Sequence, residues 1–179
     1  MSFGRYEQDG DEANGPEPIE WLVPDTDDGT ATLISRYVLH AARYNGSALD
    51  IGYLANQYRS DIYKWMNGEF ANEAFTQSEL AMLETADGQA VTLLSVDDAN
   101  RCFSSDSDRV CLATAEAVAR GAALDSSGVA NWWLTTPGRV NSTKAAIVRY
   151  DGEVDADGVS IQLKEGVRPV IRLRLAELP

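Results

Sequence analysis

Residues 60–70 read SDIYKWMNGEF, and this stretch decides how the middle of the chain folds. Ser60 can cap a helix, because a serine hydroxyl accepts a hydrogen bond from the first turn. The apolar residues that follow repeat at helical spacing; they are Ile62, Trp65, Met66 and Phe70. Asn67-Gly68 is expected to fray or end the helix. The stretch therefore predicts a helix with one apolar face near the centre of the chain.

Strands are predicted on both sides of this helix. Residues 19–23 alternate, with Ile19, Trp21 and Val23 on one face and Glu20 and Leu22 on the other. Further strands are expected at residues 3–6, 30–39, 90–94, 131–134, 145–150, 159–163 and 167–175. In the strand expected at residues 167–175, Pro169 indicates an edge strand or a β-bulge.

Short helices are predicted between the two groups of strands. Thr76 with Glu79 has the pattern of a capping box, and so has Ser95 with Asp98. An alanine-rich helix is expected at residues 113–120, ended by Gly121. Strands at both ends with helices in the middle predict an α+β fold, with a mostly antiparallel sheet shared by the terminal strands. The 179 residues fit one domain, 1–179.

The composition excludes some classes of partner. The net charge is -13, with 28 acidic against 15 basic residues, so nucleic acid and anionic membrane surfaces are not expected partners. No apolar run approaches the roughly 20 residues of a membrane span, so membrane insertion is not expected. The N-terminal residues lack the apolar core of a signal peptide. The chain is therefore expected to stay inside the cell or to reach a phage or cell surface by a non-classical route.

Catalytic signals are weak. His40 is the single histidine, so a zinc site with several histidine ligands cannot form. Cys102 and Cys111 could form a disulfide, but the favoured interpretation is that both are free thiols. Pairing of a cysteine with His40 for nucleophilic catalysis is formally open, but nothing in the sequence favours it. The chain also has no glycine loop of the phosphate-binding kind.

Acidic clusters raise the question of calcium. Asp25, Asp27 and Asp28 precede Gly29, and Asp97 with Asp98 and Asp106 with Asp108 are further pairs. Carboxylates are ligands that calcium prefers, but no cluster has the spacing of a calcium loop. Turn and capping chemistry explains most of these acids, so no cofactor is expected and calcium remains the open alternative.

Several motifs, taken in order along the chain, resemble a known family. They are FGRY (3–6), PIEW (18–21), DIYKWMNGEF (61–70), AFT (74–76), LLS (93–95), WWL (132–134) with PG (137–138), and GVRP (166–169). Together they resemble a bacterial domain family of uncharacterised function, related to the formylglycine-generating-enzyme branch of the C-type lectin fold. The resemblance implies a C-type-lectin-like fold. One departure is Thr135-Thr136, where the family usually has Arg-Ser.

Members of that family recur as the variable proteins of diversity-generating retroelements. In those systems a reverse transcriptase copies a template with adenine-directed errors into the last part of the gene. The resemblance implies a scaffold made of residues 1–138 and 166–179 and a candidate variable, ligand-binding segment at residues 139–165. The cysteine pair of the formylglycine-generating enzymes lies late in those chains, whereas Cys102 and Cys111 do not. That activity is therefore not transferred.

The candidate ligand-binding residues combine charge, hydroxyl groups and aromatic rings, which suits protein or sugar recognition. From residue 149 to 157 the charges alternate with other residues, and on a strand they would share one face. The alternative is an ordinary solvated face. Trp132 and Trp133 face opposite sides of a strand, so one could line a ligand surface, although core packing of both is favoured. The candidates are Trp133, Arg139, Asn141, Ser142, Lys144, Arg149, Tyr150, Asp151, Glu153, Asp155, Asp157, Ser160, Gln162 and Lys164.

Three functional hypotheses follow. The first is a non-enzymatic binding domain whose partner is a protein or a cell-surface glycan. The second is an oxidase similar to the formylglycine-generating enzymes, which would need a cysteine of low pKa. The third is a fixed structural subunit of a phage or secreted particle. Arg168 is expected to support the fold by bonding backbone carbonyls or a carboxylate, and the sequence assigns no oligomeric state.

Overall fold

The computed structural model describes residues 2–177, which form a mixed α+β structure with two five-stranded sheets. The first sheet has the strand order β1 (Ser2–Tyr6), β2 (Glu17–Asp27), β3 (Thr30–Ser35), β10 (Val170–Arg174) and β5 (Val91–Thr92). The second has the order β4 (His40–Arg43), β9 (Lys164–Val167), β6 (Trp132–Pro137), β7 (Lys144–Val148) and β8 (Val154–Ser160). The predicted α+β class is confirmed.

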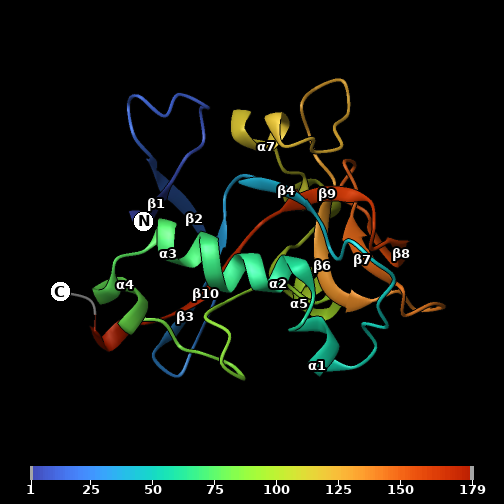
Figure 1. Cartoon of the computed structure of the whole chain (residues 1–179). Coiled ribbons are helices and arrows are strands. Elements are labelled where there is room, and N and C mark those ends of the chain that lie inside the picture. The colour runs from blue at the N-terminus through green and yellow to red at the C-terminus, as the bar shows by residue number, and fades with distance from the viewer. Residues whose placement is uncertain (1, 178–179) are drawn as a thin grey trace.

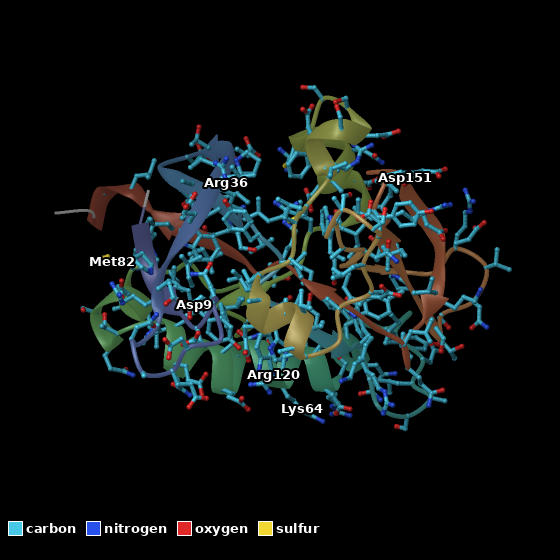
Figure 2. All side chains as sticks on the ribbon, turned by 90° about the horizontal axis from the view of Figure 1, so that it is seen from above. Asp9, Arg36, Lys64, Met82, Arg120 and Asp151 are labelled. Carbon is cyan, nitrogen blue, oxygen red and sulfur yellow. The ribbon has the colours of Figure 1, made fainter. Side chains whose placement is uncertain are left out.

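The helices are short and lie between β4 and β6 in the sequence, apart from a final 3₁₀ turn, η2 (Leu175–Glu177). They are α1 (Leu54–Gln57), α2 (Asp61–Trp65), the π-helical turn η1 (Met66–Phe70), α3 (Ala71–Ala74), α4 (Gln77–Ala81), α5 (Val96–Cys102), α6 (Asp106–Arg109) and α7 (Ala115–Ala119). In Figure 1 the run from α2 to α3 crosses the front of the molecule, between β1 to β3 on the left and β6 to β8 on the right. Charged side chains cover the outside (Figure 2).

The strands pair antiparallel, except that β6 runs parallel to β9. The first and last strands, β1 and β10, belong to the same sheet, as predicted, although β2 and β3 lie between them. The closing strand predicted at residues 167–175 is split in two, with β9 in the second sheet and β10 in the first. The chain crosses between the sheets at Arg168-Pro169, because proline cannot donate the hydrogen bond that would continue β9.

The central helix does not end at Asn67-Gly68, contrary to the prediction. It widens into η1 and continues into α3. The side chain of Asn67 explains this: its amide donates to the carbonyl oxygens of Tyr63 (3.2 Å) and Val91 (2.9 Å), and its oxygen accepts from the backbone N–H groups of Ala90 and Val91. Asn67 thus ties the helix to β5.

The capping predictions have mixed outcomes. Thr76 with Glu79 and Ser95 with Asp98 both form complete capping boxes. Ser60 occupies the position before α2, but its hydroxyl donates to the carbonyl of Gln57 (2.5 Å) and does not cap the helix.

The alternation predicted for residues 19–23 also fails at one residue. Ile19 and Trp21 are buried, whereas Val23 is 50% exposed. The register of β2 against β3 shifts between Leu22 and Asp25. Such an irregularity turns the following side chains to the other face of the strand.

The ends of other predicted elements differ as well. The strand expected at residues 30–39 ends at Ser35, whose hydroxyl donates to the carbonyl of Tyr37 (2.8 Å) in a turn. The strand expected at residues 159–163 ends at Ser160, because Leu163 N–H donates back to the Ser160 carbonyl (2.9 Å). The predicted alanine-rich helix is shortened to α7.

Two buried clusters hold the sheets and helices together. One combines the central helix with the aromatic residues of β1 and β2 and includes Trp133. The other lies under α5 and α7 and includes Trp132. Strand β6 therefore has apolar packing on both of its faces. In the described part of the chain, no helix combines the length and apolar character that crossing a bilayer requires.

Candidate functional site

The segment 139–165 forms the β7–β8 hairpin and the loops on either side of it. Its strand β7 is buried, with Ala145, Ala146, Ile147 and Val148 each at most 2% exposed. The exposed residues of the segment are Arg139, Val140, Asn141, Thr143, Tyr150, Asp151, Glu153, Asp157, Gln162, Leu163 and Lys164. All except Asp157 in β8 and Lys164 in β9 lie in the connections. The segment therefore combines a core strand with mostly polar connections that face solvent.

The charges of residues 149–157 do not alternate along one strand, contrary to the prediction. Arg149 to Glu153 form the tight turn between β7 and β8. Within it, Arg149 approaches Asp151 (3.8 Å) and Glu153 (3.5 Å), and its guanidinium lies 5.9 Å from the centre of the Tyr150 ring. These contacts gather a cation, two carboxylates and an exposed aromatic ring at one end of the hairpin.

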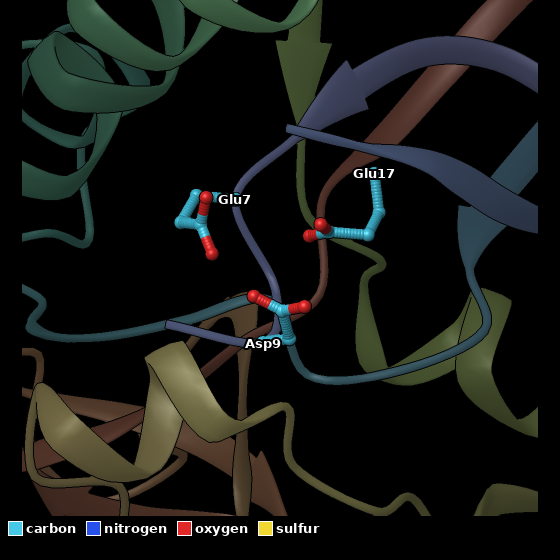
Figure 3. Close-up of side chains that lie close together, drawn as sticks. All are labelled: Glu7, Asp9 and Glu17. Atoms are coloured by element: carbon cyan, nitrogen blue, oxygen red, sulfur yellow. The ribbon is translucent and has the colours of Figure 1, made fainter. Parts of the chain in front are cut away.

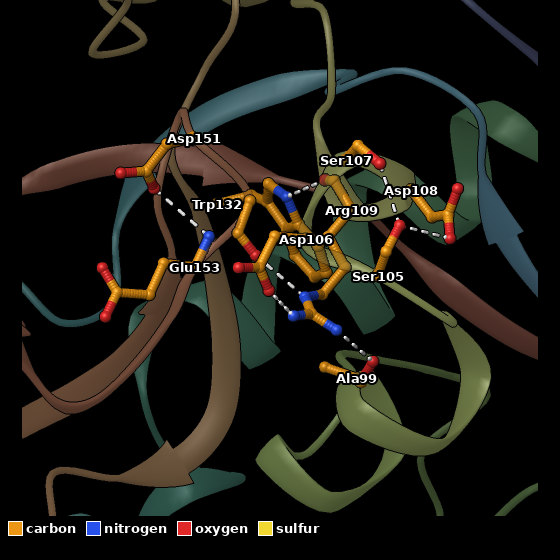
Figure 4. Close-up of polar contacts among 10 residues, drawn as sticks. Ala99, Ser105, Asp106, Ser107, Asp108, Arg109, Trp132, Asp151 and Glu153 are labelled. Carbon is orange, nitrogen blue, oxygen red and sulfur yellow. Dashed lines mark hydrogen bonds and ion pairs between the residues drawn. The ribbon is translucent and has the colours of Figure 1, made fainter.

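Arg109 anchors this turn to the body of the protein (Figure 4). Its buried guanidinium donates from Nε to the Gly152 carbonyl (2.8 Å) and from Nη2 to Asp106. Gly152 has a φ of +85°, and a Cβ there would lie 1.8 Å from the backbone oxygen of Asp106. Only glycine fits this conformation and this close approach. The turn is thereby held in one position.

The other exposed residues lie at the opposite end of the hairpin. Arg139 pairs with Asp157 (2.8 Å), while Asp155 Oδ1 accepts from the N–H groups of Asp157 and Gly158 (both 3.0 Å). Gly158 has a φ of +71°, and a Cβ there would lie 2.3 Å from the Ala145 carbonyl oxygen. These contacts order an irregular stretch of β8, where its register against β7 shifts.

The remaining candidates pack beside these. Asn141 accepts from the N–H of Thr143 (2.8 Å), and the Ser142 carbonyl accepts from Ile51 (2.9 Å). Lys144 and Ser160 are cross-strand partners. Gln162 donates to the Gly46 carbonyl (3.3 Å), and Lys164 donates to the Arg120 carbonyl (2.9 Å). The structure therefore divides the predicted residues between the two ends of the hairpin and strand β9, where Lys164 lies, and does not bring them into one patch.

Trp133 must be removed from the predicted ligand surface. Its side chain is fully buried, and its Nε1 donates to the Ala42 carbonyl (2.9 Å). Trp132 is also buried and donates to the Arg109 carbonyl (3.2 Å). Core packing of both indoles, the favoured alternative, is what the structure contains.

Arg168 supports the fold, as predicted. Its Nε and Nη2 donate to the Ser35 carbonyl (3.1 and 2.9 Å), and its guanidinium lies 4.7 Å from the centre of the Trp132 ring. Burial lowers the pKa of this guanidinium from its usual range. Its partners are a backbone carbonyl and aromatic faces, so the interaction of Arg168 joins the end of β3 to the crossing between the sheets.

Cys102 and Cys111 are both free thiols, as the favoured interpretation predicted. Burial raises the pKa of each thiol above its ordinary value, although Arg101 and Arg168 respectively oppose the effect. A raised pKa reduces the thiolate fraction on which nucleophilic cysteine chemistry depends.

In each acidic cluster named from the sequence, at least one carboxylate is engaged elsewhere. Asp25 pairs with Arg101, Asp98 caps α5, and Asp106 pairs with Arg109. A different cluster of Glu7, Asp9 and Glu17 has carboxylate oxygens within 4.8 Å of one another (Figure 3).

Hydrogen bonds account for the geometry of this cluster. Glu7 accepts from Gly10 N–H (2.7 Å) and Glu17 from Gln8 N–H (2.8 Å). The Asn14 amide donates to Asp9 and lowers the pKa of that carboxyl. Three carboxylates could accept a hard cation, but their arrangement is explained by the turn between β1 and β2. Tyr6 is the cross-strand partner of Glu17 in that hairpin, and no local sequence pattern indicates this register.

Comparison with known proteins identifies a family. The model of a family described as a domain of unknown function, DUF6273, matches residues 80–175. This chain belongs to the DUF6273 family. No curated protein and no solved structure matches it. The DUF6273 assignment carries no link to C-type-lectin-like or retroelement proteins.

The DUF6273 match contains the whole segment 139–165 but not the first four strands. Both sheets combine strands from inside and outside the match, since β10 pairs with β3 and β9 pairs with β4. The N-terminal part of this chain therefore completes the sheets on which the DUF6273 segment rests.

Proposed function

We propose that this chain is a non-enzymatic ligand-binding domain of C-type-lectin-like fold, in which segment 139–165 supplies the contacts. The observation that carries the proposal is the contrast within the segment. A buried strand, β7, carries polar connections that are exposed and yet held in place by Arg109 and Asp155. Pre-ordered contact residues lose less entropy on binding, which favours affinity.

The chemistry of the connections supports a protein or a cell-surface glycan as the partner. Tyr150 is 45% exposed and lies beside Arg149, Asp151 and Glu153. Tyrosine and arginine are enriched where proteins recognise other molecules, because both offer a large contact area together with directional polar groups. The order of the sequence motifs is the support for the lectin-like fold and for diversification of this segment.

Two alternatives receive less support. An oxidase similar to the formylglycine-generating enzymes needs a reactive cysteine, and burial raises the pKa of both thiols. A fixed structural subunit would use the same exposed connections for permanent contacts, and a stable stoichiometric complex with a neighbouring gene product would distinguish it from the binding domain.

The first test is to sequence this gene and its flanks from many related isolates. Diversification predicts substitutions at exposed positions such as Arg139, Tyr150 and Gln162, matched to adenines in a nearby template repeat. The buried residues of β7, together with Gly152 and Gly158, should stay constant. A uniform segment without a template or reverse transcriptase would contradict diversification and leave a binding domain of fixed specificity.

The second test addresses binding directly. The protein is applied to a glycan array and to arrayed bacterial surface proteins, and Tyr150→Ala is compared with Tyr53→Ala. Tyr53 is 68% exposed but lies outside the segment. The proposal expects Tyr150→Ala to weaken the captured signal and Tyr53→Ala to leave it unchanged. Equal effects of the two variants would contradict the assignment of the binding surface.

A further inference from the structure

A hollow of about 620 Å³ opens beside strand β4, the edge strand of the second sheet. The residues that give it chemical character come from separate parts of the chain; they are His40, Arg43, Asp61, Trp65, Arg120 and Lys164. Ligand sites of small molecules commonly have volumes of about 300–1,000 Å³, so the hollow is large enough for a sugar. Of these residues, only Lys164 was predicted from the sequence to bind a ligand.

The lining is cationic although the chain carries a net charge of -13. Arg43, Arg120 and Lys164 line the hollow together with a single carboxylate, Asp61. Asp61 also lies 3.8 Å from Lys64, outside the lining. Figure 2 shows Arg120 and Lys64 at the same edge of the molecule. A concentration of positive charge on an acidic protein attracts an anion to that place.

The cations are only partly neutralised by the protein. Arg120 donates from Nε to Glu116 (2.7 Å), while its side chain remains 53% exposed. Lys164 donates to the Arg120 carbonyl, which carries no formal charge. Within residues 2–177 no carboxylate forms an ion pair with Arg43. Charge-assisted contacts to a ligand carboxylate therefore remain available.

His40 and Trp65 form the aromatic part of the hollow. Their rings stack, with centroids 4.1 Å apart and planes 16° from parallel. Burial, together with nearby Arg120 and Lys164, lowers the pKa of His40 to about 4, so the imidazole is neutral at pH 7. Burial also raises the pKa of Tyr6, whose hydroxyl lies 3.3 Å from His40 Nδ1.

These contacts favour one tautomer of His40. A phenol that stays protonated can donate to Nδ1, which leaves the imidazole proton on Nε2. His40 Nε2 makes no hydrogen bond with any described residue. It is therefore a spare donor among the cations of the hollow.

We propose that this hollow binds a small acidic sugar, with its carboxylate held by Arg43 and Arg120 and its ring against Trp65. Lys164 and His40 Nε2 donate further hydrogen bonds to the ligand. Indole surfaces pack well against the apolar side of a ligand while polar groups beside them fix its orientation. The site goes beyond the proposed function, because apart from Lys164 its lining contains no residue of segment 139–165.

Intrinsic fluorescence provides the readout, since Trp65 is half-buried whereas Trp21, Trp132 and Trp133 are at most 5% exposed. The full chain is titrated with glucuronate, with glucose as the neutral sugar and with sulfate as the sugar-free anion. We expect a saturable change with glucuronate alone, which weakens as salt screens the charges. Equal responses to glucose, equal binding of sulfate, or no response to glucuronate would overturn the assignment.

A double variant, Arg120→Gln with Lys164→Gln, is expected to weaken glucuronate binding by about tenfold or more, because it removes two charged contacts. The matched control is Arg139→Gln with Lys144→Gln, which makes the same change of net charge outside the hollow. The inference is wrong if the control weakens binding as much. Tyr150→Ala should leave glucuronate binding intact. Its effect on the array signal tests the proposed function separately.

One measurement needs no variant and so does not depend on whether a variant folds. Iodide and caesium quench exposed indoles and differ in the sign of their charge. Iodide is intrinsically the stronger quencher, so each quenching constant is divided by the constant for free N-acetyltryptophanamide. A cationic hollow predicts that this relative constant is larger for iodide than for caesium, against the trend expected from the negative net charge. A larger relative constant for caesium would overturn the inference.

Discussion

Replacing Gly152 with alanine is expected to detach the turn of residues 149–153 from the protein body. Gly152 has a φ of +85°, and the added Cβ would lie 1.8 Å from the Asp106 backbone oxygen. Contact at that distance is not tolerated, so the turn and helix α6 must separate. The hydrogen bond from Arg109 Nε to the Gly152 carbonyl (2.8 Å) is then lost.

The magnitude follows from two contributions. A non-glycine residue in the left-handed region costs about 1–2 kcal/mol, and loss of a hydrogen bond to a charged group costs about 1.5–3 kcal/mol. The free energy of unfolding should therefore fall by about 3–5 kcal/mol in total. For a chain of this length, each kcal/mol lowers the melting temperature by about 2–4 °C.

Gly10→Ala is the matched control. Gly10 has a φ of +80°, but an added Cβ would meet no atom within 4 Å, so only the cost of the backbone conformation applies, about 1–2 kcal/mol. Urea unfolding of both variants, followed by circular dichroism, measures the difference. If Gly152→Ala is no more destabilising than Gly10→Ala, the turn is not held by close contact with α6.

Three further predictions concern the scaffold. Asn67→Ala should lower the free energy of unfolding, measured by urea titration, by about 2–4 kcal/mol, because four hydrogen bonds to backbone groups are lost. The control Asn72→Ala loses one exposed hydrogen bond and should lower it by less than about 1 kcal/mol in the same titration. The pKa of His40 is lowered from 6.5 to about 4, so its contribution to stability is complete above pH 6.5 and is lost as the pH falls towards 4. Between pH 6.5 and pH 4, the free energy of unfolding of the wild type should fall by about 3 kcal/mol more than that of His40→Gln. Urea unfolding at several pH values measures this, and parallel plots of unfolding free energy against pH for the two proteins would contradict it. Ser95→Ala should cost about 1 kcal/mol through loss of a helix cap, whereas Ser105→Ala, whose hydroxyl caps no backbone N–H, should be near neutral in thermal unfolding.

Local patterns in the sequence predicted local structure well. The capping boxes at Thr76 and Ser95 join groups three residues apart, so the residue types alone indicate them. The end of the central helix was predicted wrongly because the partners of Asn67, Ala90 just before β5 and Val91 in it, lie 23 and 24 residues further along the chain. The asparagine can be seen in the sequence, but its contact with a segment so far along the chain cannot.

The candidate site shows the same limit. The polar residues of segment 139–165 were expected to be exposed, and most of those in the connections are, although Ser142 and Arg149 are only partly exposed. Trp133 was misplaced because adjacent strand residues indicate two faces but not what covers each face, and both faces of β6 are buried. The anchoring of Gly152 by Arg109 spans 43 residues, and no local signal indicates it.

The parallel pairing of β6 with β9 places the start of β6 beside the end of segment 139–165, while the segment itself begins at the far end of β6. Trp132 is the partner of Gly166 across these strands, and Gly166 N–H donates to the Asn131 carbonyl (2.9 Å). A connection between parallel strands must run back along the length of the first strand before the second can begin, so it cannot be a short turn. Replacement segments grafted between β6 and β9 should therefore be accepted only when they keep a returning apolar strand in place of Ala145, Ala146, Ile147 and Val148.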